Sequence, residues 1–190
     1  MDRTLNLDRS ILLVKDMSLR ERLSGKAKWT VFKFVDPDGK IYEKLRAGAD
    51  PRDLKPYSVE EIKGNVLLNE GIGLLIDIIT GIDTTSNKWD SANAHIGVGD
   101  GTTAEDASQT GLQGTNTAFK GMDSGYPTRD GNKAIWRATF GGTEANFAWE
   151  EFTVVNASDD SGTNLNRKVV SKGTKAEGET WTVQLEITFS

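Results

Sequence analysis

Three alternating glycines, Gly97, Gly99 and Gly101 in the segment IGVGDG, are the first residues whose spacing is suited to chemistry. Glycine-rich turns between a strand and a helix bind phosphates, because their backbone N–H groups point at the anion. A dinucleotide fingerprint, however, places its third glycine three residues after the second and opens a helix there. The residues after Gly101 form no amphipathic helical pattern and contain no Lys-Ser/Thr pair. The spacing therefore favours a tight turn or a close backbone approach over a phosphate loop.

Nucleophilic and thiol chemistry find little support in the sequence. His95 is the single histidine, and the nucleophile-elbow sequence Gly-x-Ser-x-Gly does not occur. We expect His95 to be exposed or to make a structural hydrogen bond. The chain has no cysteine, which removes thiol catalysis, cysteine zinc sites and disulfides together.

Two pairs of neighbouring acidic residues are candidates for acid/base catalysis or metal binding. Glu150 and Glu151 lie in a predicted strand, where adjacent side chains point to opposite faces, so they do not form an acid/base pair with each other. Asp159 and Asp160 offer the oxygen ligands that calcium takes, but the EF-hand pattern is missing and a polar hairpin loop is favoured. A hydrolase with two carboxylates in a cleft is the enzyme alternative, and no spacing predicts it. We therefore expect no enzyme, no cofactor and no metal site.

The elements that must position these residues are mainly strands. The last strand shows alternation of polar residues with Trp181, Val183, Leu185, Ile187 and Phe189. Further strands are predicted in KAIWRATF, in ANFAWEEFTVV and over residues 167–171. Short strands between Gly, Asn, Asp and Ser clusters predict a mainly β fold, an antiparallel β-sandwich or small barrel. Trp136, Trp149 and Trp181 are expected in the core or an interface rather than on a sugar platform.

The segment KWTVFKFV is predicted to start a β-hairpin. It is followed by the turn Asp36-Pro37-Asp38-Gly39 and by KIYEKL, which is predicted to be the second strand. Trp29 falls on one face of the first strand, whereas Phe32 and Phe34 fall on the other. Apolar residues on both faces indicate burial on both sides, or an interface on one.

One helix is predicted over residues 69–80, with Asn69 as its N-cap and Gly81 as its terminator. Its apolar residues lie on most sides, so we expect a buried helix packed against a sheet. A strand through residues 62–68 is expected to precede it.

Residues 1–25 lack a sustained apolar period and are predicted to form an N-terminal arm, with one short helix near residues 19–23. The apolar run at residues 11–14 is too short for a signal-peptide core. No membrane span is expected, because the longest apolar segment contains Gly73 and Asp77. Residues 26–190 are then expected to form a single β-rich domain. Its parts are a hairpin region (26–66), a strand end and helix (67–82) and a β-sandwich (83–190).

Charge is unevenly distributed along the chain, whose net charge is −5. Residues 1–66 carry 14 Lys and Arg against 11 Asp and Glu, whereas the remainder carries 9 against 17. An acidic body without a basic, aromatic-rich cluster argues against nucleic acid as a partner. The basic front indicates a solvated face, with docking onto a partner protein as the alternative. The candidates for partner docking are Arg3, Arg9, Lys15, Arg20, Arg22, Trp29, Phe32 and Phe34.

Several blocks over residues 64–190 resemble, in order, a family of tailed-bacteriophage virion proteins. They are GNVLLNEGIGLLIDIITG, NAHIGVGDG, GMDSGYPTRDG, IWRATFGGTEANFAWEEF, GTNLNRKV and KGTKAEGETWTVQLEITF. The resemblance implies a structural component that is made in the host cytoplasm, assembled into the virion and usually homo-oligomeric, with no catalytic residues.

From this resemblance we expect a capsid decoration or cement protein that binds the major capsid protein through the arm and the hairpin. A trimer is the working hypothesis for the oligomer, because capsid lattices offer local threefold axes. The alternative is a tail or neck component, such as a tail fibre, tail tip or adaptor, that acts in host attachment.

Overall fold

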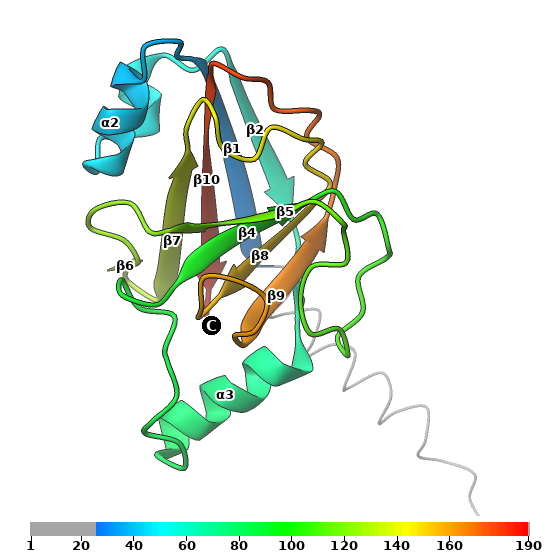
Figure 1. Ribbon diagram of the computed structural model, residues 1–190. Helices are drawn as coiled ribbons and strands as arrows, with labels where there is room; N and C mark the ends of the chain where they lie inside the picture. Colours follow the sequence, from blue (N-terminus) through cyan, green and yellow to red (C-terminus); the bar gives the residue numbers. More distant parts are fainter. Residues whose placement is uncertain (1–25, 190) are drawn as a thin grey trace, which may run out of the picture.

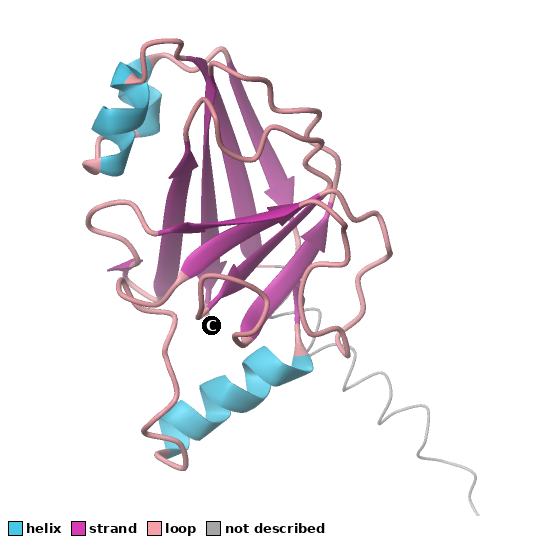
Figure 2. Ribbon diagram, viewed as in Figure 1, coloured by secondary structure: helices cyan, strands magenta, loops and turns pink. Residues whose placement is uncertain are grey.

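The computed structural model describes residues 26–189, which form two five-stranded antiparallel sheets with helices at opposite ends (Figures 1 and 2). Sheet A contains, in order, β2 (Ser58–Lys63), β1 (Ala27–Val35), β10 (Glu179–Thr188), β7 (Lys133–Phe140) and β6 (Thr128–Asp130). Sheet B contains, in order, β3 (Val66–Leu67), β9 (Asn164–Val169), β8 (Glu151–Val155), β4 (His95–Gly99) and β5 (Thr117–Gly121). The predicted β-sandwich is confirmed, since the strands form two separate sheets rather than one closed barrel.

The core lies between the sheets and is rich in aromatic side chains. Trp149 packs edge-on against Trp181, with ring centroids 4.8 Å apart, and against Phe140 at 5.0 Å. These edge-to-face contacts stabilise the core beyond simple burial. Trp136 is also buried. The prediction that these tryptophans lie in the core is confirmed.

Sheet A joins the two ends of the described chain. β1 pairs with β10 over nine residue pairs, from Ala27 opposite Ile187 to Val35 opposite Glu179. The expectation that the sandwich is confined to residues 83–190 is therefore wrong. The long strand β10 supplies the neighbouring strand within sheet A. Sheet B covers the apolar inner face of β1, where the fully buried Trp29 packs against Phe152 of β8 with ring centroids 5.7 Å apart.

The second strand of the predicted hairpin is a helix, α2 (Lys40–Arg46), followed by a 3₁₀ turn, η1 (Pro51–Leu54). Gly39 turns the chain with a φ of 71°, and the buried carboxylate of Asp36 accepts the N–H groups of Ile41 (3.0 Å) and Tyr42 (2.8 Å). These are N–H groups of the first turn, which lack partners within a helix. Ile41 and Leu45, one turn apart, then pack on the outer face of β1. The hydrogen bonds that Asp36 accepts at the start of α2 therefore outweigh the alternating pattern that predicted a strand.

The predicted helix is present as α3 (Asn69–Thr80) and ends at Gly81, which has a φ of 74°. Its N-cap residue is Leu68 and not the predicted Asn69, which is instead the first residue of the helix. The strand expected before it is divided at Gly64, whose φ of 83° turns the chain from β2 into β3. None of the helices within residues 26–189 has the length and apolar character needed to cross a membrane.

Only the first half of α3 is packed on the sandwich. A Cβ on Gly71 would lie 2.6 Å from the Cα of Leu165 in β9, so glycine permits a close helix–strand contact. Leu74 is also buried, whereas Ile76 and Ile79 are 51% and 75% exposed. The expectation of a buried helix is therefore wrong for the second half, where the helix extends away from the strands (Figure 1).

Candidate functional site

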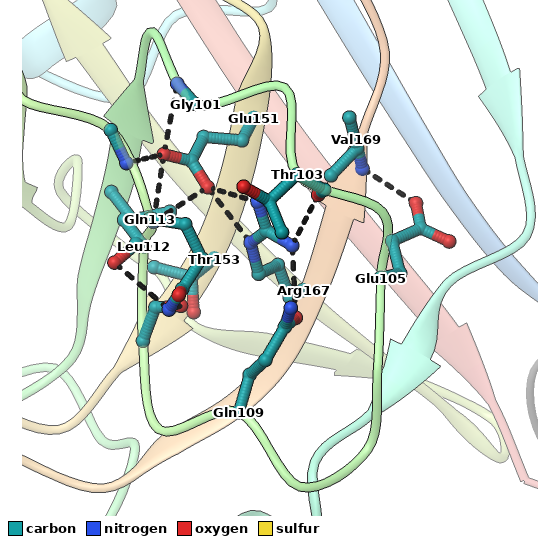
Figure 3. Close-up of polar contacts among 12 residues, drawn as sticks. Gly101, Thr103, Glu105, Gln109, Leu112, Gln113, Glu151, Thr153, Arg167 and Val169 are labelled. Atoms are coloured by element: carbon teal, nitrogen blue, oxygen red, sulfur yellow. Dashed lines mark hydrogen bonds and ion pairs between the residues drawn. The ribbon is translucent and has the colours of Figure 1, made fainter.

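The glycine-rich segment starts in β4, which contains Gly97 and Gly99, and continues at Gly101 into a loop, residues 100–116. This loop folds over the carboxylate of Glu151 (Figure 3). The N–H of Gly101 donates to Oε1 at 3.1 Å and that of Gly114 at 2.7 Å, while the N–H of Gln113 lies 3.0 Å from both oxygens. Converging backbone N–H groups form an anion-binding site. The anion that occupies this one is a side chain of the same protein.

Close packing explains the alternating glycines. A Cβ on Gly99 would lie 2.6 Å from Oε1 of Glu151, and one on Gly101 would lie closer still. A Cβ on Gly97 would lie 2.7 Å from the side chains of Phe119 and Thr153 on the flanking strands. The predicted close approach is confirmed, and it is an approach to the protein's own side chains.

Arg167 completes the cluster from the neighbouring strand β9. Its Nε donates to Oε2 of Glu151 at 2.8 Å, and its Nη2 lies 2.6 Å from the same oxygen. Its Nη1 donates at 2.9 Å to the carbonyl of Thr103 and to the side chain of Gln109. Both charged side chains are fully buried. We call this pair with the loop over it the loop latch; it is a structural element whose polar groups are used internally.

The remaining chemical candidates also have structural partners. His95 Nδ1 lies 2.9 Å from the carbonyl of Asn93, as predicted for a structural hydrogen bond. Glu150 accepts from the Ser171 hydroxyl, so it shares no partner with Glu151. Asp160 accepts from the N–H of Leu112 at 3.3 Å, and burial raises the pKa of its carboxyl group.

Across the part of the chain that the structure describes, no three acidic or histidine side chains gather into a metal-binding group. The loop acids Asp159 and Asp160 therefore have no third ligand of these types near them. Asp159 instead accepts the N–H of Ser161 at 2.9 Å, which is the local hydrogen bond of a polar turn.

The aromatic docking candidates are inside this chain. Trp29 lies in the main core, and Phe32 and Phe34 lie in a second cluster under α2 and η1. The prediction that their side chains dock on a partner is therefore wrong, because the protein itself buries all three. The other five candidates and the predicted short helix lie in residues 1–25, outside the described residues.

A second buried charge cluster was not apparent in the sequence. Asp123 accepts from Arg137 Nε at 3.0 Å, from Arg46 Nη1 at 2.9 Å and from the Thr139 hydroxyl at 2.8 Å. Burial raises the pKa of the Asp123 carboxyl group, against the effect of the two arginines. The cluster ties α2 to sheet A, and its members are too far apart in sequence to form a motif.

The α2 end carries a surface pocket of about 650 Å³. Its lining includes Tyr42, Asp38, Glu144 and Glu177. Lys120 pairs with Glu144 and donates to the Tyr42 hydroxyl at 2.9 Å. The pocket therefore presents one aromatic ring and several carboxylates to solvent.

The opposite end exposes large apolar side chains. Ile76, Ile79 and Ile82, which we call the α3 ridge, are 51%, 75% and 76% exposed. The helix has acidic residues and no lysine or arginine, and Asp83 follows the ridge. Hydrogen bonds from Ser86 and Thr85 hold the pKa of Asp83 well below its usual range, so its carboxylate remains charged. The ridge is an apolar surface with an acidic border.

The sequence did not predict the ridge, because its apolar pattern predicts a helix that is buried along its whole length. Apolar residues on nearly every side of a helix exceed what a single sheet can cover. That excess was the available signal for a surface that a partner covers.

Comparison of the chain with protein-family models, curated proteins and solved structures gives no significant match. The features of the molecule that bear on its function are therefore the loop latch, the pocket and the α3 ridge.

Proposed function

We propose that this chain is a structural protein of a tailed-bacteriophage virion, and within the virion a capsid decoration or cement protein. The observation that carries the proposal is the α3 ridge. Large apolar side chains gathered at one exposed place indicate a protein–protein contact, because their hydration is unfavourable. The resemblance of residues 64–190 to virion proteins supports the same assignment.

The described domain is suited to this role because buried ion pairs within the chain hold its loops in place. The loop latch and the Asp123 cluster hold irregular segments in one arrangement through buried, paired charges. A preformed surface loses little conformational freedom on binding. The proposed role requires rigidity and attachment, and no catalytic group.

The proposed mechanism is thermodynamic linkage. A protein that binds only the assembled lattice of the major capsid protein stabilises that lattice, by an amount that grows with its concentration above the dissociation constant. Residues 1–25 would add a second contact, and once the first contact forms the next becomes intramolecular. In this proposal the protein is made in the host cytoplasm and works in the virion.

Copy number in purified particles is the first test. Quantitative mass spectrometry would measure this chain relative to the major capsid protein. Near-stoichiometric amounts, with a tail-tube position excluded by imaging, would support decoration. A few to a few dozen copies would favour the tail or neck, and absence from the particle would overturn both proposals.

Capsid binding tests whether the ridge and residues 1–25 are needed for decoration, either at the capsid contact or in assembly of the oligomer that binds it. We expect Ile79→Lys and a chain lacking residues 1–25 each to bind undecorated capsids more weakly than the full chain. Val35→Lys is the matched control, because Val35 is 67% exposed and lies on β1, outside the ridge. Unchanged binding of the chain without residues 1–25 would contradict attachment through the arm.

A tail or neck adaptor is the second candidate, and the pocket beside α2 favours it. An aromatic ring next to carboxylates suits a hydroxyl-rich or cationic ligand on a cell surface. Saturable binding of the purified chain to host cells, weakened by Glu177→Ala, would favour this alternative. Glu177 is exposed, so the substitution tests the pocket without disturbing the core.

A further inference from the structure

We infer that the α3 ridge is the binding site for residues 9–15, Arg-Ser-Ile-Leu-Leu-Val-Lys, of a second copy of this chain. The inference deepens the proposed function and rests on it only for the place where the resulting oligomer works.

The two surfaces match in apolar character. The ridge presents Ile76 and Ile79, three residues apart on one face of α3, and Ile82 just beyond the helix. Residues 11–14 are four consecutive aliphatic residues, and no other run in residues 1–25 is comparable. Burying such side chains against each other removes both from water, which is the main favourable contribution to association.

The charges beside the two surfaces are opposite. Arg9 and Lys15 stand on either side of the aliphatic run, whereas α3 carries Asp77 between the ridge isoleucines and Asp83 follows it. The C-terminal end of a helix also carries partial negative charge. A basic–apolar–basic segment therefore complements the acidic border of the ridge, and opposite charges favour this pairing over others.

The chain enters the described domain on the α3 side. The carbonyl of Ala27, the first residue of β1, accepts the N–H of Gly64 at 3.0 Å, and α3 starts five residues after Gly64. Residues 15–26 span up to about 40 Å when extended. The 12 residues of α3 span about 18 Å, so residues 15–26 are long enough to extend past the whole helix to a copy packed beside it.

Each copy offers one segment and one ridge. Such a contact is head-to-tail, and it closes into a ring when the rotation between copies allows. A closed ring leaves every ridge covered, which accounts for three exposed isoleucines on a protein that must stay soluble. This route gives the homo-oligomer without any contact between the two sandwiches.

Engineered cysteines test the contact directly, because the chain contains none. One batch of full chain carries Leu12→Cys and a second carries Ile79→Cys; the two are mixed and oxidised. We expect a disulfide between chains that joins position 12 to position 79, identified by peptide mass spectrometry. Val35→Cys mixed with Leu12→Cys is the matched control, since Val35 is 67% exposed against 75% for Ile79 and lies outside the ridge.

Two results would overturn the inference. One is cross-linking of 12 to 79 no faster than of 12 to 35. The other is a chain carrying both Leu12→Cys and Ile79→Cys that cross-links only within itself, which would place the segment on its own ridge. Either result leaves particle copy number, and with it the proposed function, untouched.

Solution size and charge reversal give the quantitative test. In analytical ultracentrifugation, Ile79→Lys should weaken self-association about tenfold or more, while Val35→Lys leaves it unchanged. Lys15→Glu should also weaken it, and combining Lys15→Glu with Asp77→Lys should restore it. A wild-type chain that stays monomeric at every concentration would overturn the inference, as would association that Ile79→Lys and Lys15→Glu do not alter.

Discussion

The loop latch and the α3 ridge invert the usual distribution of side chains. In the latch, Glu151 and Arg167 are charged and fully buried, whereas the ridge isoleucines are apolar and mostly exposed. Burying a charge and exposing an aliphatic side chain are both unfavourable in isolation. The latch compensates within the chain, because each charge finds its partner and hydrogen bonds there. Among residues 26–189 nothing comparable covers the ridge, and in our proposal residues 9–15 of a second copy cover it.

This difference between the loop latch and the α3 ridge bears on which region of the protein carries its function. The glycine-rich segment most resembled a binding loop, but its N–H groups bind the carboxylate of Glu151 from the same chain. The α3 ridge, in contrast, exposes apolar side chains to water and contains no chemical motif. Four substitutions probe how the protein compensates for buried charges and exposed apolar side chains.

Replacing the latch carboxylate should have the largest effect. Glu151→Gln removes the charge that faces Arg167 and leaves a buried guanidinium unpaired. Breaking such a pair from one side costs about 3 to 5 kcal/mol. Urea denaturation followed by fluorescence would measure the loss, with Glu150→Gln as the neighbouring control, expected within about 0.5 kcal/mol of wild type. A loss below about 1 kcal/mol in Glu151→Gln would show that the pair does not hold the loop.

Lys175 tests a buried charge without a carboxylate in contact. Its ammonium donates to the Gly141 carbonyl at 2.7 Å and to Asn146 Oδ1 at 2.8 Å. Burial lowers the pKa of Lys175 from 10.5 to about 8. Below the folded pKa of about 8, the folded state must bury a charge, and this cost is fully present. Above it the unfolded chain binds more protons, so the Lys175 contribution makes stability rise with pH toward 10.5.

Lys175→Met should remove this pH dependence. The full contribution is up to about 3 kcal/mol, the free-energy equivalent of the lowered pKa. Denaturant midpoints measured from pH 7 to pH 10 on wild type and Lys175→Met would isolate it, since other groups titrate alike in both proteins. Parallel pH profiles for the two proteins would contradict the expected effect of burial.

A methyl group at Gly101 should strain the latch without removing a charge. The added carbon would meet Glu151 Oε1 and, at 2.6 Å, the backbone nitrogen of Gly114. Overpacking of this kind costs about 1 to 3 kcal/mol. Gly73→Ala is the control, because that helical glycine has open space around it and alanine favours helix by up to about 1 kcal/mol. Equal stability changes in the two variants would show that the latch tolerates expansion.

Shortening a ridge isoleucine should have the smallest effect on folding. Ile79→Ser removes an exposed side chain, so the free energy of unfolding of the isolated domain should change by no more than about 0.5 kcal/mol. Leu74→Ala, five residues earlier on the buried side, should cost about 2 to 5 kcal/mol. Thermal unfolding at low protein concentration would compare the two. A large loss in Ile79→Ser would mean that the ridge supports the fold itself.

Several features could be predicted because their cause is local. The alternation in β10 requires only that one face be buried, and the helix over residues 69–80 needs only its apolar pattern and Gly81. The alternating glycines predicted a close backbone approach for a similar reason, since a missing side chain leaves room for a neighbour. These inferences need no knowledge of which segments meet.

The errors arose where a contact outside the predicted strand itself decided the structure. KIYEKL has both an alternating and a helical apolar spacing, and the buried Asp36 carboxylate selects the helix by binding its first N–H groups. The side on which Phe32 and Phe34 are covered follows from that helix. Neither could be read from the strand pattern of β1 alone.

By itself, the sequence determined a cysteine-free, mainly β chain with one α-helix over residues 69–80, because periodicity and glycine placement act over a few residues. Only the tertiary structure decided that β1 pairs with β10, that Glu151 meets Arg167 under the glycine loop, and that half of α3 leaves the sandwich. The physical reason is that burial and charge pairing depend on which segments become neighbours. A sheet assembled from both ends of a chain brings together residues whose sequence separation carries no trace of their contact.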